Sequence, residues 1–261
     1  MKKSRLKLMF HVVLGYPNLE ESQRLIAELC RRDIDYLEIQ VPFSDPMADG
    51  PLITRANQIA LAQNVSIKDV IETIHQNAHT MPNLLLMSYF QPVFNVGAAK
   101  IFDQLAKAGA YGCIIPDLPI DQVEAALFDR ATSQNLVMVP VFSPAMSIER
   151  IRKYQAVKPK LVYCTARQGI TGTKSNFAQL DYIQTVGQIL DCETVLGFGI
   201  QDPETLAKLP PYVGGVAIGS KIIDTIEKHD GNITAALDLV DTFIASRNAI
   251  TSGTITSKEK L

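Results

Sequence analysis

Residues 37–51 read LEIQVPFSDPMADGP, an apolar strand that contains one acid, Glu38, and runs directly into a loop with two more, Asp45 and Asp49. A carboxylate within an apolar strand is costly to bury unless it is paired with another group or takes part in catalysis. We therefore interpret this segment as a catalytic edge of the molecule. The pattern within it, a short apolar run followed by a loop and then a helical stretch, recurs along the whole chain and predicts the fold.

Short apolar runs alternate with longer stretches of helical periodicity from one end of the chain to the other. The predicted strands span 7–13, 36–41, 83–87, 112–115, 137–141, 161–164, 194–198 and 214–218. Helices are predicted after Asn18, Ser66, Ser147 and Asp202, whose side chains can accept hydrogen bonds from the free N–H groups of a first turn.

Eight strand–helix units without a break in composition predict an α/β protein with a single (β/α)8 TIM-barrel domain over residues 1–247. A doubly wound open sheet is the alternative, but it rarely uses eight such even units. Residues 248–261 lose the periodicity and gain Ser, Thr and Lys, which predicts a polar, flexible C-terminal tail.

Composition narrows the kind of ligand. The formal net charge is −2 and no Lys/Arg-rich run is present, so the sequence gives no electrostatic case for nucleic acid or a membrane surface. No apolar run approaches the roughly 18 residues of a membrane span. The four cysteines stand singly, without a CxxC pair or a zinc-like spacing. These features predict a reduced, cytoplasmic protein that holds no metal and acts on a small molecule.

In a TIM barrel the active site forms at the carboxyl ends of the strands. Two glycine-bearing turns, Gly197-Phe198-Gly199 and Gly219-Ser220, follow the last two predicted strands. Glycine lets backbone N–H groups approach an anion, and a helix N-terminus follows, so this pair of turns predicts a phosphate site. Gly172, after the sixth strand, would add a third N–H group and Ser220 a hydroxyl. The alternative is that these glycines only shape tight turns.

Glu38 and Asp49 can face one ligand from two sides, as general acid–base catalysis requires. Each could instead be structural, Glu38 paired with a base and Asp49 shaping a turn. His11 lies in the first strand and lines either the barrel mouth or the core. Further candidates follow the fourth and sixth strands: Asp117, Tyr163 and Arg167. Because no nucleophilic triad is present, the pattern predicts acid–base chemistry on a phosphorylated small molecule.

The chain resembles the tryptophan synthase α subunit family over essentially its whole length. The most specific match is the segment 37–51. Shorter matches in the same order are LGYP at 14–17, MSY at 87–89, PDLP at 116–119, RQGITG at 167–172, GFGI at 197–200 and GS at 219–220.

The resemblance implies a lyase of tryptophan biosynthesis that cleaves indole-3-glycerol phosphate to indole and glyceraldehyde 3-phosphate by a retro-aldol reaction. Glu38 matches the catalytic glutamate that moves protons to indole C3 and from the glycerol hydroxyl. Asp49 matches the aspartate that binds the indole N–H and stabilises the positive charge that develops. The matching substrate-binding residues are Tyr89, Tyr163, Thr171, Gly172, Gly199, Gly219 and Ser220.

The resemblance also implies a partner. Family members dock on a β subunit, commonly as an α2β2 heterotetramer, and pass indole to it through a tunnel. Pyridoxal phosphate belongs to that β subunit, so no cofactor is expected in this chain. Asp45-Pro46 matches the region that contacts the partner, and Thr171 matches the loop that closes over the substrate.

The chain departs from the family pattern at several positions. Gln40 stands where the family usually has Gly, Gln91 where it has Asn, and His11 where it has an apolar residue near the indole pocket. Strand one also starts close to the first residue, which predicts that the short helix at the bottom of the barrel is missing or reduced.

Two functional classes therefore remain open. The chain is either an active lyase or a weakly active subunit that mainly binds and allosterically regulates a β partner. The presence of both Glu38 and Asp49 favours the lyase. A different phosphate-binding barrel, such as a sugar-phosphate isomerase, has no support from the segment 42–51.

Overall fold

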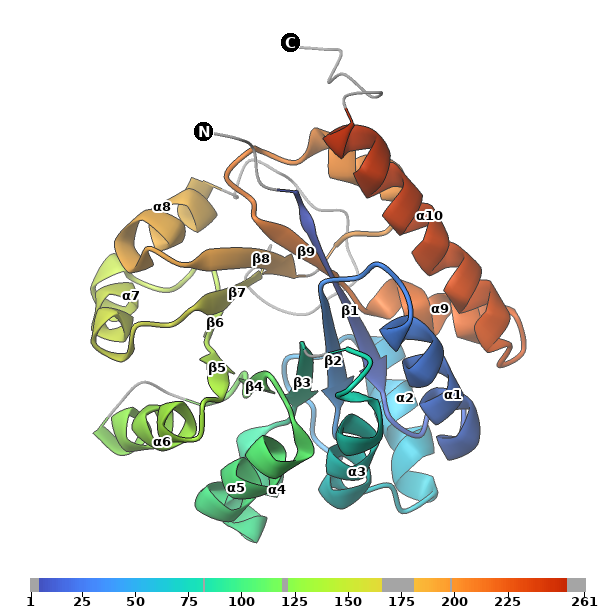
Figure 1. Cartoon of the computed structure of the whole chain (residues 1–261), viewed down its shortest axis with the longest axis horizontal. Helices are drawn as coiled ribbons and strands as arrows, with labels where there is room; N and C mark the ends of the chain where they lie inside the picture. The colour runs from blue at the N-terminus through green and yellow to red at the C-terminus, as the bar shows by residue number, and fades with distance from the viewer. Residues whose placement is uncertain (1–4, 82, 119–121, 166–180, 198, 253–261) are drawn as a thin grey trace.

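The computed structural model describes residues 5–81, 83–118, 122–165, 181–197 and 199–252. Its strands are parallel and form one sheet, which helices surround (Figure 1). The strands are β1 (Lys7–Val13), β2 (Tyr36–Gln40), β3 (Leu84–Met87), β4 (Gly112–Ile114), β5 (Val137–Val139), β6 (Val141–Phe142), β7 (Leu161–Thr165), β8 (Glu193–Gly197) and β9 (Gly215–Ile218). The predicted TIM barrel is confirmed, and β1 has the predicted bounds.

The predicted fifth strand is divided at Pro140 into β5 and β6. Val139 pairs with β4, whereas Val141 pairs with Tyr163 of β7, so the two halves join opposite neighbours. Proline has no N–H group to donate to a ladder, but the Pro140 carbonyl still accepts from the Tyr163 N–H at 2.9 Å. This single run of chain therefore closes the sheet order β5-β4-β3-β2-β1-β9-β8-β7-β6 into a barrel.

The helices are α1 (Leu19–Cys30), α2 (Pro51–Ala62), α3 (Ile67–Asn77), α4 (Phe90–Val96), α5 (Ala98–Ala108), α6 (Gln122–Ser133), α7 (Ile148–Lys153), α8 (Asp181–Leu190), α9 (Ser220–Lys228) and α10 (Ile233–Thr251). Asn18 caps α1 by accepting from the Glu21 N–H, and Ser66 opens α3 in a capping box with Asp69. After Asp202 the predicted helix is instead the 3-10 segment η3 (Pro203–Lys208), and Asp202 makes no side-chain cap. A second 3-10 segment, η1 (Tyr154–Val157), follows α7.

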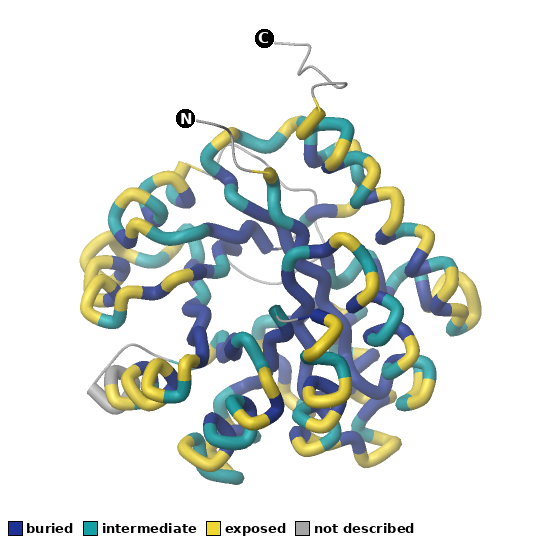
Figure 2. Tube along the Cα trace, viewed as in Figure 1, coloured by how far each residue is buried: buried dark blue, intermediate teal, exposed yellow. Residues whose placement is uncertain are grey.

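Alternate residues of each strand face two different cores. On β1, Leu8 and Phe10 pack outward against the helices, while Met9 points into the barrel beside Tyr36 of β2. Figure 2 shows the strands as the buried centre and the helices as elements that alternate between buried and exposed faces. Strands buried on both faces explain why the sequence shows continuous apolar runs rather than alternation. The same alternation directs Glu38 into the barrel.

Helix α10 is fixed to the amino-terminal end of the barrel by Arg247, whose side chain is fully buried. Its guanidinium donates to Asp33 Oδ2 at 2.5 Å and to Asp35 Oδ2 at 3.1 Å. The helix then continues to Thr251. The prediction of a tail from residue 248 is therefore wrong for residues 248–251, because this ion pair anchors the last turns; residues 253–261 lie outside the described part.

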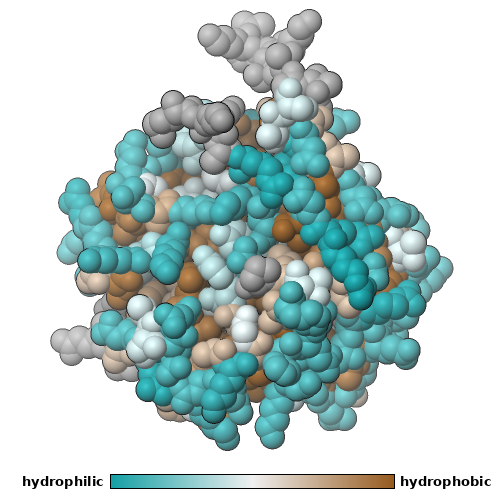
Figure 3. Space-filling model, in the orientation of Figure 1, coloured by the Kyte–Doolittle hydropathy of each residue, from teal (hydrophilic) through white to brown (hydrophobic). Residues whose placement is uncertain are grey.

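The face of the molecule in Figure 3 is mainly hydrophilic along its helices, with apolar atoms showing between them. Of the helices in the described part of the chain, none is both long and apolar enough to cross a membrane. Large apolar side chains that are exposed among the described residues are Met47, Ile59, Phe94 and Ile148.

Candidate active site

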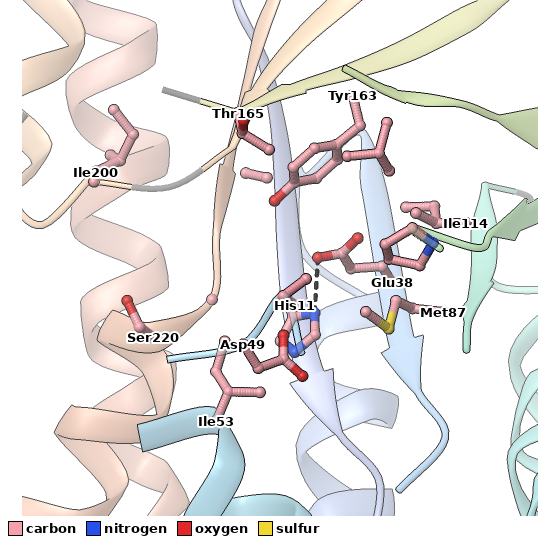
Figure 4. Close-up of a pocket in the computed structure, with 16 residues that line it drawn as sticks. His11, Glu38, Asp49, Ile53, Met87, Ile114, Tyr163, Thr165, Ile200 and Ser220 are labelled. Carbon is pink, nitrogen blue, oxygen red and sulfur yellow. Dashed lines mark hydrogen bonds and ion pairs between the residues drawn. The ribbon is translucent and has the colours of Figure 1, made fainter. Parts of the chain in front are cut away.

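A cavity lies at the carboxyl ends of the strands and encloses about 680 Å³, including its open mouth. Its wall is contributed by nearly every strand of the barrel or by the residues that follow it (Figure 4). The lining residues are His11, Glu38, Ala48, Asp49, Ile53, Met87, Ile114, Pro116, Val141, Tyr163, Thr165, Gly199, Ile200, Ala217, Gly219 and Ser220.

Glu38 is paired with His11. The two residues stand opposite each other on β2 and β1, and His11 Nδ1 lies 2.7 Å from Glu38 Oε1. Each is only 4% exposed, so water screens the pair little. Burial lowers the pKa of the imidazole, but the charge of Glu38, the hydrogen bond to it and the charge of Asp49 raise the pKa of His11 above its usual value. The partner of Glu38 is thus a titratable group that can exchange a proton with it.

Asp49 comes from the loop after β2 and is held by Gln40. The Gln40 amide donates to Asp49 Oδ2 at 2.8 Å and lies 3.4 Å from Asn57 Oδ1, which in turn accepts from the Phe43 N–H. Burial raises the pKa of Asp49, and the nearby His11 and the hydrogen bond from Gln40 oppose that rise. Figure 4 shows His11 lying between the carboxyl groups of Glu38 and Asp49. The two acids therefore share one wall of the cavity.

Tyr163 lies on β7, and its ring packs over Gly197 of the neighbouring strand β8. An added Cβ at Gly197 would fall 1.9 Å from Tyr163 Cε1, so the tyrosine ring occupies the space that any other residue at 197 would fill. Burial, together with the charges of Glu38 and Asp49, raises the pKa of the Tyr163 hydroxyl well above its usual value. The hydroxyl therefore stays protonated at neutral pH.

Gly199, Gly219 and Ser220, from the two glycine-bearing turns, line the same cavity as the acids. Gly199 has a φ of +94°, which glycine adopts without strain. Gly219 precedes Ser220, the first residue of α9, so the free N–H groups of that helix face this side of the cavity. An added Cβ at Gly219 would lie 3.1 Å from the Cβ of His11. The arrangement can bind an anion a short distance from the acid pair.

Several predicted residues lie elsewhere. Tyr89 is buried but is not among the residues that line the cavity; its hydroxyl accepts from the Ala48 N–H at 3.0 Å and its ring stacks on Phe43. It therefore supports the loop that carries Asp49. Asp117 accepts from the Phe90 N–H at the start of α4, outside the cavity wall. Arg167, Thr171 and Gly172 lie outside the described residues.

Two cavity neighbours were not assigned a role from the sequence alone. The sequence alone does not decide whether His11 lines the barrel mouth or the core, and it marks Gln40 only as a departure from the family pattern. The missing signal was the register of β1 on β2, which sets His11 opposite Glu38 and Val13 opposite Gln40. In the described part of the chain, no three His, Cys, Asp or Glu side chains come together in a way that could hold a metal ion.

Comparison with known proteins gives consistent results. A sequence model of the tryptophan synthase alpha chain family matches residues 1–250. The tryptophan synthase alpha chain of Petrotoga mobilis is 31% identical over 248 residues, covering 94% of this chain and 95% of the relative. That of Chloroflexus aggregans is 35% identical over 228 residues, covering 86% of this chain and 85% of the relative.

The fold has solved counterparts as well. The crystal structure of tryptophan synthase subunit alpha from Legionella pneumophila matches with a TM-score of 0.82 and 26% sequence identity, covering 93% of each chain. A chain in the crystal structure of tryptophan synthase from Mycobacterium tuberculosis matches with a TM-score of 0.83 at 24% identity, which concerns the fold alone. Sequence and fold thus point to the same set of proteins.

Proposed function

The chain belongs to the tryptophan synthase α chain family, and we propose that its cavity is where indole-3-glycerol phosphate is cleaved to indole and glyceraldehyde 3-phosphate. As a member of this family the chain is a lyase of tryptophan biosynthesis. The observation that carries the proposal is that Glu38 and Asp49 share a cavity with Gly199, Gly219 and Ser220. An acid pair facing an anion cradle fits a substrate with a reactive ring at one end and a phosphate at the other.

Glu38 is assigned the proton transfers. It delivers a proton to indole C3 and then takes the proton of the hydroxyl on the adjoining glycerol carbon, while the bond from that carbon to C3 breaks. The bonding electrons return to the indole ring, and the hydroxyl carbon becomes the aldehyde of glyceraldehyde 3-phosphate. General acid–base steps of this kind contribute about 10²- to 10⁴-fold to a rate.

Asp49 is assigned to the indole nitrogen. When C3 is protonated, positive charge develops on the ring, and a carboxylate at the N–H stabilises it more in the transition state than in the ground state. Gln40 holds Asp49 through Oδ2, and a hydrogen bond with the Tyr89 side chain also orients the carboxyl group. Tyr163 supplies a protonated hydroxyl in the opposite wall.

The phosphate is assigned to Gly199, Gly219 and Ser220, with the N-terminus of α9 facing it. Thr171 and Gly172 join this assignment on their sequence match alone. The fold supplies the acids, the hydroxyl and the anion cradle for cleavage, so we propose that no cofactor is bound here and that pyridoxal phosphate belongs to a β partner. We also propose that the chain works in the cytoplasm, where amino-acid biosynthesis takes place.

The test is release of indole from indole-3-glycerol phosphate by the purified full chain, with and without a tryptophan synthase β subunit. We expect release by the wild type and a loss of at least 10²-fold in Glu38→Gln. Glu193→Gln is the matched control, because Glu193 is also a strand glutamate with a basic partner, Lys7, but lies at the other end of the barrel. Absence of indole from the wild type with the partner present would contradict the lyase assignment.

The phosphate assignment has its own variant. Ser220→Asp places a negative charge in the cradle, so we expect KM for indole-3-glycerol phosphate to rise at least tenfold. Ser220→Ala removes only one hydroxyl donor and adds no charge, so its KM should rise less than that of Ser220→Asp. Equal KM values for the two variants would contradict a phosphate at this turn.

The regulatory role of a β partner is the second candidate, and one observation favours a docking surface. Met47 is 85% exposed in the loop after β2, and Phe94 is 67% exposed on α4 after the neighbouring strand β3. Exposed apolar side chains on a loop and a helix that follow adjacent strands suit a protein interface. We propose that a β subunit docks here as α2β2, with Asp45-Pro46 in the same loop.

The docking proposal is tested with Met47→Asp and Phe94→Asp, measured by binding to a β subunit and by sedimentation of the complex. Each should raise Kd about tenfold or more. Ile148→Asp is the control, because Ile148 is half exposed on α7. If Ile148→Asp weakens binding as much as the other two, the proposed surface is wrong.

A further inference from the structure

The cavity holds a titratable side chain that the cleavage chemistry above does not use. His11 lies in the wall, bonded through Nδ1 to Glu38, and it is almost completely buried. Its other ring nitrogen, Nε2, is also buried and makes no hydrogen bond of normal geometry among the described residues, as is true of Gln40 Oε1. The Gln40 side chain nevertheless lies close enough to help raise the pKa of His11. A histidine that served only the core would have both nitrogens satisfied, since an unmade buried hydrogen bond is costly.

We propose that His11 is a positioning residue for Glu38. The two side chains form a buried imidazole–carboxylate dyad, in which His11 holds the carboxylate in place and stores the proton that Glu38 passes to the substrate. The proposal rests on the function proposed for Glu38. Because His11 Nδ1 occupies Oε1, the second oxygen of Glu38 is left for the substrate.

The need for such a store comes from the chemistry of cleavage. A carboxyl group of ordinary acidity is ionised at neutral pH and has no proton to give to indole C3. A dyad that holds one proton can keep it on Nδ1 at rest and transfer it to Oε1, which leaves a neutral imidazole and a carboxylic acid. Rotation of the Glu38 carboxyl group about Cγ–Cδ then turns the protonated oxygen from His11 to the substrate. Glu38 then protonates C3, receives the glycerol hydroxyl proton as the carbon–carbon bond breaks, and returns a proton to His11. Each turnover therefore leaves the dyad as it began.

The surroundings of the ring fit this role. Gly219 packs against His11, with an added Cβ 3.3 Å from the ring atom Cδ2, so the backbone there limits movement of the ring. Around the His11 ring, in the described part of the chain, the titratable groups are its partner Glu38 from β2 and Asp49 from the following loop. Tyr163 from β7 lies near both acids. Two acids around one imidazole favour the cation, consistent with the raised pKa of His11.

The first test does not depend on activity. Ring ¹⁵N NMR of the labelled full chain follows the titration of His11, identified by the signal missing in His11→Phe. We expect His11 to titrate above about pH 6.5, the ordinary midpoint for histidine, and Glu38→Gln to move its titration to lower pH. A His11 titration that Glu38→Gln leaves unmoved would overturn the dyad.

The second test uses indole release in the presence of a β subunit. His11→Phe keeps a ring of similar size but cannot hold the proton, so we expect kcat to fall about 10- to 100-fold, the size of a lost charge-assisted hydrogen bond, with KM within about threefold. His11→Asn keeps a donor near the place of Nδ1 but has no titratable proton. Its kcat should lie between those of the wild type and His11→Phe, and its alkaline pH limb should move to lower pH.

A double variant separates action through Glu38 from a general effect on the site. If His11 acts through Glu38, His11→Phe will have no further effect on kcat in the Glu38→Gln background. Full additivity, or an unchanged kcat and pH profile in both single His11 variants, would overturn the proposal. If the wild type releases no indole, the lyase assignment fails, while the NMR titration still decides whether the dyad exists.

Discussion

The side-chain amide of Gln40 donates a 2.8 Å hydrogen bond to Asp49 Oδ2. Gln40, a departure from the family pattern, is therefore the direct partner of a candidate catalytic acid. Both side chains are buried, Gln40 completely. Glycine, which the family resemblance leads one to expect at this position, has no side chain that could make this bond. Gln40 therefore orients Asp49 in a way that is built into this chain.

Removal of the Gln40 amide should weaken the fold locally. We expect Gln40→Ala to lower the free energy of unfolding by about 1 to 3 kcal/mol, because Asp49 loses a buried donor. The free energy is measured by urea denaturation at pH 7. Gln76→Ala removes a comparable amide from the exposed pair with Glu72 and should change stability by less than about 0.5 kcal/mol. Equal effects of the two substitutions would contradict this account.

Gly197 should not tolerate a side chain. In Gly197→Ala the new Cβ would meet the ring of Tyr163 at 1.9 Å, so the ring or the strand must shift, at a cost of about 1 to 3 kcal/mol in unfolding free energy. Gly187→Ala is the control, since its Cβ would make an ordinary 3.5 Å contact and lies within α8. That change should be neutral or stabilising. Thermal unfolding of both variants decides the comparison.

Stability should fall as pH rises above about 6.5. The pKa of His11 is raised in the folded protein, so the folded state binds its proton more tightly than the unfolded state does. This contribution is complete below the unfolded pKa and is lost as pH rises through the folded pKa, with a slope of at most about 1.4 kcal/mol per pH unit.

The slope can be assigned with variants. Urea unfolding from pH 6 to 9 should show it in the wild type and in His79→Gln, an exposed histidine, but not in His11→Phe. Asp49 also has a raised pKa and adds a fall of the same sign, which begins at lower pH, near its unfolded value of 3.8. A slope that persists in His11→Phe would show that another group causes it.

The ion pairs of Arg247 should be among the costly ones to break. Arg247→Met removes the buried partner of Asp33 and Asp35, but both acids keep Arg5, so we expect a loss of about 1 to 3 kcal/mol in unfolding free energy. Arg130→Met breaks the exposed pair with Asp103 and should cost less than about 1 kcal/mol. Denaturation that gives similar values for both variants would mean that α10 is not anchored by Arg247.

The sequence predicted the barrel because its signals are local. Apolar runs, the caps Asn18 and Ser66, and the glycines after the last strands each act within a few residues, and all of them agree. Two of the errors were also local in origin. Pro140 divided a strand, and the segment after Asp202 formed a 3-10 turn in place of a helix. The C-terminal helix ran past residue 247 because a distant ion pair holds it, which no local pattern records.

The sequence by itself determined the fold class, the family and the candidate acids Glu38 and Asp49, since periodicity and a contiguous motif carry that information. Only the tertiary structure decided what those acids touch. His11 and Gln40 became their partners because the parallel register of β1 on β2 and the return of the following loop bring together side chains that are 27 and 9 residues apart. Tyr89 was likewise placed under the loop and not in the cavity. Burial at the carboxyl end of the barrel then shifts the pKa values of His11 and Asp49, and this burial exists only once the chain has folded.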